Sequence, residues 1–172
     1  MSGATDTARD IYMTGLRNQH AVENEAISLL NRQIERLENY PELEERMRRH
    51  VNESEEQIRR LEELLQSFGT SHSTFKDTVA SIGANLAALG HSMAPDEIIK
   101  NSFANFAFEN YEIASYKGLL VLAEASGHSS AQSALEQSLR EEQDMAQFID
   151  SHLRDTALKF LARKSAGQTA GV

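Results

Sequence analysis

The residues from Phe103 to Gly127 form an apolar stretch with two glutamates in its middle, and this combination restricts the possible folds more than any other feature. Read as a helix, the stretch repeats apolar side chains at alternating spacings of three and four, which is typical of a helix packed in a bundle. Glu109 falls halfway along this apolar seam, and Glu112 follows one helical turn later. An ionised carboxylate in a packed seam costs several kcal/mol unless it is paired or bound to a cation. The rest of the chain should therefore supply what satisfies Glu109.

Four long amphipathic patterns predict an all-α fold, with helices over 10–39, 42–68, 96–126 and 130–163. The passage between the second and third helices is too long for a tight turn and contains a shorter helical pattern near 74–89. It fits a crossover that joins two antiparallel helix pairs. We therefore expect one antiparallel four-helix bundle domain over residues 10–163, with flexible ends at 1–9 and 164–172.

Glutamates recur at the middle of these helices. Glu23 and Glu142 lie near mid-length on the seams of the first and last helices. The seam of the second helix carries a serine at this height, but His50, Glu53 and Gln57 line one of its flanks. Because the mid-points of helices in an up-down bundle meet at one level, the sequence predicts a layer of carboxylates in the core. This coincidence is the strongest functional signal in the chain.

Carboxylate-rich sites with a few imidazoles suit iron or manganese, and helix bundles build them from inward-facing glutamates. The usual pattern takes one glutamate from each of two helices and Glu-x-x-His from each of the other two. This chain matches it in part, because Glu56 and Met145 stand where histidines would follow Glu53 and Glu142. A metal-free bundle whose carboxylates share protons and bond to neighbouring polar groups therefore stays open as the alternative. Those groups would be Tyr111, Tyr116, His20 and Gln57, with His20 and His50 at the edge of the core.

Composition excludes several other classes of function. The net charge of -9, with no basic face to offset it, argues against a nucleic-acid binder. The absence of cysteine rules out disulfides, thiolate catalysis and cysteine-ligated metal clusters. We find no apolar run long enough to span a membrane and no signal-peptide pattern, so we expect no membrane contact and a cytoplasmic protein.

Four segments resemble the YciE/YciF-type ferritin-like stress proteins. ENYEIASYKGLLVLAEASG is similar to the signature third helix of that family, where E-H-Y-E-I-A-S-Y precedes a similar apolar run. LRNQHAVENEA is similar to the first helix of the family, HVNESEEQIRRLEE to its second and LEQSLREEQDMA to its fourth. The resemblance covers roughly residues 10 to 160.

The resemblance implies a bacterial ferritin-like bundle, often dimeric, that is linked to stress responses and has a dimetal carboxylate site. Carried over by motif, the metal ligands would be Glu23, Glu53, Glu109, Glu112 and Glu142. The chain departs from the family pattern where Asn110 replaces the usual histidine, Asn52 a common glutamate and Ala146 a frequent aspartate.

Our sequence-based hypothesis is a ferritin-like homodimer that binds two ions of iron or manganese per chain. Such a centre could oxidise ferrous iron or consume peroxide or oxygen, with Tyr111 or Tyr116 as a nearby phenol. The competing hypothesis is a metal-free helical interaction protein with a vestigial site. Helix outer faces carrying Leu119 and Leu122, or the apolar side of the 74–89 segment, are the expected dimer surfaces.

Overall fold

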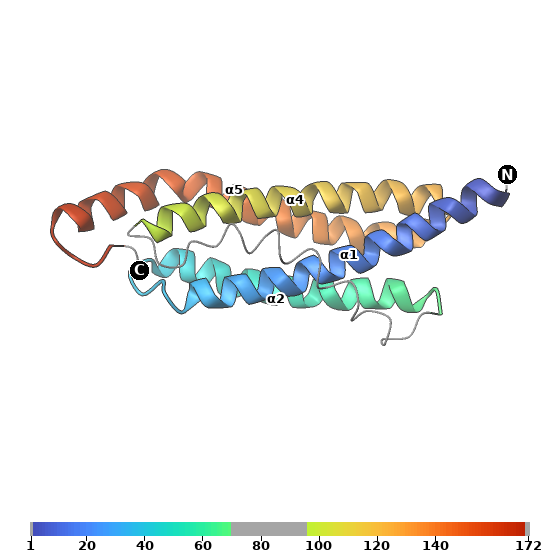
Figure 1. Cartoon of the computed structure of the whole chain (residues 1–172), viewed down its shortest axis with the longest axis horizontal. Coiled ribbons are helices and arrows are strands. Elements are labelled where there is room, and N and C mark those ends of the chain that lie inside the picture. Colours follow the sequence, from blue (N-terminus) through green and yellow to red (C-terminus); the bar gives the residue numbers. More distant parts are fainter. Residues whose placement is uncertain (1, 70–95, 171–172) are drawn as a thin grey trace.

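The protein is an antiparallel bundle of four long helices, seen in a computed structural model that describes residues 2–69 and 96–170, with side chains from residue 5 (Figure 1). The helices are α1 (Ser2–Ile34), α2 (Pro41–Gln66), α4 (Glu97–Ala125) and α5 (Gln132–Ser165), and a short 3-10 turn, η3 (Ser129–Ala131), precedes α5. The shortest, α2, has 26 residues and is therefore about 39 Å long. The described residues contain no strand, so the predicted all-α bundle is confirmed.

The chain forms two helical hairpins that pack side by side. Within the first, Pro41 occupies the first turn of α2, where its missing N–H is not needed. Within the second, Gly127 leaves the helix with a φ of 79°, a left-handed conformation that glycine adopts without strain. Because α2 ends and α4 begins at opposite ends of the bundle (Figure 1), the connection between them is a crossover. The predicted short helix near 74–89 lies outside the described residues.

The observed helices differ from the predicted ranges mainly at the ends of the chain. Helix α1 begins at Ser2 rather than at residue 10, and α5 continues to Ser165. The residues after α5 turn back toward the loop between α1 and α2, where the Tyr40 hydroxyl donates to the Ala170 carbonyl at 2.6 Å. These contacts place the described part of the predicted flexible tail, up to Ala170, against the bundle.

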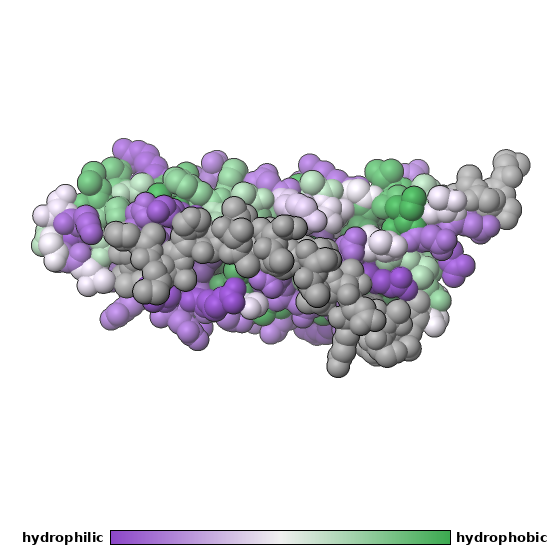
Figure 2. Space-filling model, viewed as in Figure 1, coloured by the Kyte–Doolittle hydropathy of each residue, from purple (hydrophilic) through white to green (hydrophobic). Residues whose placement is uncertain are grey.

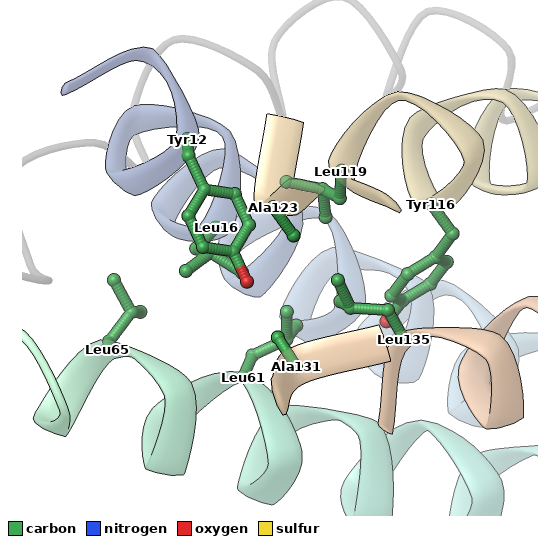
Figure 3. Close-up of a cluster of buried hydrophobic side chains, with 9 residues drawn as sticks. All are labelled: Tyr12, Leu16, Leu61, Leu65, Tyr116, Leu119, Ala123, Ala131 and Leu135. Carbon is green, nitrogen blue, oxygen red and sulfur yellow. The ribbon is translucent and has the colours of Figure 1, made fainter. Parts of the chain in front are cut away.

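Two apolar clusters fill the two ends of the core. One cluster is shown in Figure 3 and consists of Tyr12, Leu16, Leu61, Leu65, Tyr116, Leu119, Ala123, Ala131 and Leu135. The other lies toward the loop between α1 and α2 and consists of Leu30, Ile34, Leu37, Tyr40, Met47, Val51, Ile98, Met145 and Ile149. Between the two clusters, every helix contributes buried polar side chains, and a small apolar cluster of Val22, Ala26 and Phe108 lies beside them. The fold thus encloses a polar layer between two apolar layers.

The outer surface is mostly polar. Figure 2 shows hydrophilic residues along the edge formed by α2 and more hydrophobic ones along the edge formed by α4. The seam expected for α4 includes Phe106, three residues before Glu109, but Phe106 is 39% exposed and the buried face instead carries Phe108 and Glu112. Leu119, an expected dimer contact, packs inside the bundle, with Leu122 partly buried against it. None of the helices in the described ranges combines the length and apolar character needed to cross a membrane.

Candidate metal centre

The polar layer brings acidic side chains from three helices and a histidine from the fourth into one buried region. Glu23 comes from α1, His50 from α2, Glu109 and Glu112 from α4, and Glu142 from α5, and none of these residues is more than 2% exposed. The sequence predicted the meeting of these four glutamates at one level, because each lies near the middle of its helix. Their burial without an arginine or lysine among them makes this region unusual for a protein core.

His50 lies at the centre of one half of the layer. Its Nε2 atom is 3.1 Å from Glu109 Oε2 and 3.5 Å from Glu142 Oε2. The distances suit ion pairs, but none of these three atoms makes a hydrogen bond within the described residues. One ligating atom from each of His50, Glu109 and Glu142 lies within 4.8 Å of the others. A single metal ion could bind all three residues.

Glu23 and Glu112 form the other half of the layer, and both receive hydrogen bonds from neighbouring neutral groups. Gln19 Nε2 donates to Glu23 Oε1 at 2.9 Å and approaches Glu112 Oε1 at 3.4 Å. The Tyr116 hydroxyl donates to Glu23 Oε1 at 2.6 Å and is also 3.1 Å from Gln57 Oε1. These bonds use the Oε1 atom of each glutamate and leave both Oε2 atoms without a partner among the described residues. The free oxygens are therefore oriented by polar neighbours rather than neutralised by them.

Glu53 lies at the edge of the layer rather than inside it. Its Oε2 atom accepts a hydrogen bond from His50 Nδ1 at 2.8 Å and another from Arg46 Nη1 at 2.9 Å, and its side chain is 25% exposed. Partial burial acts to raise the pKa of Glu53, but the bonds from His50 and Arg46 outweigh it and lower that pKa. An ionised Glu53 fixes the proton of His50 on Nδ1 and turns Nε2 toward Glu109 and Glu142.

Glu23, Glu112 and Glu142 bind protons more tightly than glutamate normally does. Burial first, and then the charge of Glu142, raise the pKa of Glu23 to about 8, against the hydrogen bonds from Tyr116 and Gln19. Burial raises the pKa of Glu142 to about 7, although its contacts with His50 act in the opposite direction. Burial and the neighbouring glutamates also raise the pKa of Glu112 well above the usual value. Without a cation, the layer must therefore hold protons near neutral pH.

The pKa of His50 shifts in the direction opposite to the one that burial alone would give. Desolvation by itself lowers the pKa of the imidazole, but Glu109, Glu142 and Glu53 together raise it well above its ordinary value. A proton on Nε2 thus compensates the negative charge of the neighbouring carboxylates when no metal ion is bound.

The unpartnered atoms fit a metal ion. In the described part of the chain, four carboxylate oxygens (the Oε2 atoms of Glu23, Glu109, Glu112 and Glu142) and one imidazole nitrogen (Nε2 of His50) are buried without a hydrogen-bond partner. Buried polar atoms are normally satisfied, so a group of five is exceptional. Carboxylate oxygens with one imidazole form a suitable ligand set for iron or manganese.

The remaining residues predicted around the site separate into two groups. Tyr116 and Gln57 lie in the layer, where Gln57 Nε2 is 2.5 Å from Glu142 Oε1. Tyr111 is 49% exposed and points away from the core, while His20 Nε2 is 3.3 Å from Glu62 Oε1 near the surface. Sequence reasoning missed Gln19, whose only signal was its position one turn before Glu23.

The three departures from the family pattern are two exposed asparagines and one buried alanine. Asn110, in place of a histidine, is exposed and bonds the Phe106 carbonyl at 2.7 Å. Asn52 is also exposed, and Ala146 is buried beside Met145 without offering a ligand. None of the three substitutions removes one of the five unpartnered atoms.

Comparison with known proteins identifies the family. The sequence profile described as Domain of unknown function (DUF892) matches residues 7–162. A solved structure of a Xanthomonas campestris pv. campestris protein is 28% identical, with 92% of this chain and 99% of that chain covered and a TM-score of 0.76.

Two other solved structures show the same fold at lower identity. The Escherichia coli stress protein YciF is 22% identical over 88% of this chain and 98% of its own, with a TM-score of 0.75. YcfI from Rhodopseudomonas palustris is 23% identical over 83% and 92%, with a TM-score of 0.67. The match over nearly the whole chain confirms the resemblance noted in the sequence, and the protein belongs to the DUF892 family, which includes the YciE/YciF-type proteins.

Proposed function

We propose that this protein binds two divalent metal ions, iron or manganese, in the polar layer. The ligands would be Glu23, His50, Glu109, Glu112 and Glu142. The observation that carries the proposal is the set of five buried ligating atoms, drawn from all four helices, that lack a hydrogen-bond partner among the described residues. Five such atoms in one layer favour a shared cation.

Charge balance favours two ions. Four ionised glutamates carry four negative charges, which two divalent cations neutralise when His50 is neutral. Glu53 does not enter this balance, because Arg46 already compensates it at 2.9 Å. A layer neutralised in this way avoids the cost of burying several carboxylates of like charge.

The proposal exchanges the roles that the sequence suggested for two residues of α2. His50 becomes a ligand through Nε2, and Glu53 becomes the carboxylate that accepts the Nδ1 proton and holds the ring in place. Histidines that bind metals commonly donate their other N–H to a carboxylate in this way, which fixes the tautomer and raises ligand basicity. The Arg46 bond keeps Glu53 ionised for this task.

Bound iron or manganese would supply redox chemistry, passing electrons from ferrous iron, which is oxidised, to oxygen or peroxide, which is reduced. The chain contributes exclusion of water by the two apolar clusters, and a phenol, Tyr116, hydrogen-bonded to Glu23 at 2.6 Å. A role during stress accords with the description of the E. coli relative YciF as a stress protein. We place the protein in the cytoplasm as part of this proposal.

A metal-free structural role is the second candidate. The observation in its favour is that Gln19, Gln57 and Tyr116 already bond three of the four glutamates, so protons could neutralise the rest. In that case the raised pKa values of Glu23 and Glu142 would describe the working state.

Elemental analysis and thermal melting separate the two functions. Protein purified without chelator should contain about two metal ions per chain, and ferrous iron should raise its melting temperature through linkage. Glu109→Ala should weaken metal binding at least tenfold, or about 1.4 kcal/mol, and lose that rise. Glu124→Ala, an exposed glutamate on the same helix, should keep it. Absence of metal after iron supplementation would refute the proposal, and an iron-dependent rise that persists in Glu109→Ala would remove Glu109 from the ligand set.

A further inference from the structure

An open groove runs along the surface between α2 and α5. Of the four neighbouring helix pairs, α2 and α5 pack against each other least closely. The groove that results is lined by residues of α2 (Arg49, Asn52, Glu53, Glu56 and Arg60) and by residues from η3 and α5 (Ser130, Ser133, Ala134, Gln137 and Glu141). All of its lining residues except Ala134 have polar or charged side chains, and these include three glutamates and two arginines. Such a groove suits small hydrated ions better than an apolar molecule.

The groove reaches the polar layer at two points. Glu53 lines the groove and also bonds His50, whose other nitrogen faces Glu109 and Glu142. Gln57, which is fully buried, donates to Glu141 in the groove at 3.0 Å and to Glu142 in the layer at 2.5 Å. The groove and the layer are therefore separated by one side chain at each point.

Two further polar atoms lie near these points on α2. Ser54 lies on α2 between His50 and Gln57, is fully buried, and its hydroxyl has no partner among the described residues. Glu53 makes both of its recorded bonds through Oε2. The two links between groove and layer therefore run through polar atoms, at Glu53 and His50 and at Gln57.

We propose that divalent cations enter the buried layer through this groove between α2 and α5, with Glu53 as the last solvent-accessible carboxylate on the route. This inference rests on the proposed metal-binding function. Among the five glutamates that the family motif assigns as ligands, Glu53 alone has a substantially exposed side chain, whereas the other four are almost completely buried.

Two groove residues with opposite charges allow the route to be tested by electrostatics. Glu56 is half exposed, lines the groove and forms an ion pair with Arg59, so replacing it with glutamine removes one negative charge from the groove. Arg60 repels cations and forms a two-pronged ion pair with Glu141, at 2.8 Å and 2.9 Å, which occupies that carboxylate. A negative charge on the route should speed cation uptake, and a positive charge should slow it.

The experiment measures the rate of manganese uptake. Chelator-treated protein is mixed with Mn²⁺ at low salt, quenched with chelator at intervals, desalted and analysed for manganese. Glu56→Gln should take up the ion about threefold more slowly than the wild type, and Arg60→Gln about threefold faster. Both variants should reach the wild-type final content. Raising the salt concentration should shrink both differences, because the charges are exposed.

The matched controls are Glu136→Gln and Arg140→Gln, which alter an exposed ion pair on α5 outside the groove. Both should load at the wild-type rate. If the groove variants load like these controls while the wild type still takes up about two ions, the route is wrong and the metal-binding function survives. If the wild type takes up no manganese or iron at all, the metal-binding function fails and the route fails with it.

Discussion

The pH dependence of stability in the metal-free protein is the sharpest physical consequence of the carboxylate layer. Most small proteins lose stability as the pH falls toward 4, because ionised carboxylates are paired in the native state. Here the native state instead holds Glu23 in its protonated form up to a pKa of about 8. The chelator-treated protein should therefore be less stable at pH 8.5 than at pH 5.5.

The sign follows from proton binding in the two states. Between the ordinary glutamate value of 4.5 and about 8, folded Glu23 keeps a proton that the unfolded chain has released. Stability consequently falls as the pH rises through this window. Glu142, with a pKa of about 7, and His50, whose pKa is also raised, act in the same direction. Glu53 acts in the opposite direction, but its lowered pKa confines that effect to pH below about 4.5.

The magnitude is large for a single residue. At about 1.4 kcal/mol per pKa unit, the rise from 4.5 to about 8 corresponds to roughly 5 kcal/mol for Glu23 alone. Because Glu23 interacts with Glu112 and Glu142, the groups do not titrate independently, and the single-residue figures cannot be added. We expect the free energy of unfolding to fall by about 3 kcal/mol between pH 5.5 and pH 8.5.

Urea denaturation of the chelator-treated protein at pH 5.5, 7.0 and 8.5 measures this change. Glu23→Gln keeps the shape of the side chain without its charge, so it should flatten the dependence and stabilise the protein at pH 8.5 by about 2 kcal/mol. Glu25→Gln, an adjacent and more exposed change on α1, should leave the dependence as in the wild type. Stability that stays level or rises between pH 5.5 and 8.5 would refute the reasoning.

Three further predictions concern packing and assembly. Gly118→Ala should stabilise α4 by about 1 kcal/mol, because the new methyl group meets no neighbouring atom. Gly15→Ala should be less stabilising than Gly118→Ala by at least about 1 kcal/mol, because its methyl group would lie 2.9 Å from Leu119 Cδ2. Chemical denaturation of both variants measures the difference. Tyr12→Phe should be neutral or stabilising by about 1 kcal/mol, because the buried Tyr12 hydroxyl has no hydrogen-bond partner in the described residues. A clear loss of stability in the same assay would contradict this prediction. Sedimentation at micromolar concentration should give about twice the chain mass of 19.2 kDa, and a monomer would contradict the predicted homodimer.

The architecture could be predicted from the sequence because each helix carries its own apolar seam. A seam such as Leu16, Leu30 and Ile34 is fixed by the helical period, and its length fixes the length of the bundle. The same period predicted that Glu23 and Glu109 would be buried. It failed for Phe106, although Ser102 and Glu109 on either side of it along the seam are buried, because a spacing of three or four leaves open which of two nearby positions faces the core.

The detailed arrangement of the site could not be predicted in the same way. His50 and Glu53 are three residues apart on one flank of α2, and the sequence pattern does not determine which of them faces inward. The structure resolves this through Arg46, which lies one turn before His50 and draws Glu53 toward itself. Gln19 was missed because an amide carries no charge that would mark it as part of a site.

The same layer that suits a metal ion works against the stability of the fold. Replacing buried polar groups with apolar ones of similar shape usually stabilises a bundle, and the two flanking clusters already show how well this chain can pack an apolar core. Instead, Gln19, Gln57 and Tyr116 bond three of the four buried glutamates through Oε1 and leave the Oε2 atom of each without a hydrogen-bond partner among the described residues. A network built only for stability would satisfy both oxygens, or would contain no carboxylates. A set of metal ligands requires this arrangement, in which one oxygen of a glutamate is held by a hydrogen bond and the other has no partner, because the second oxygen must be free to bind the cation.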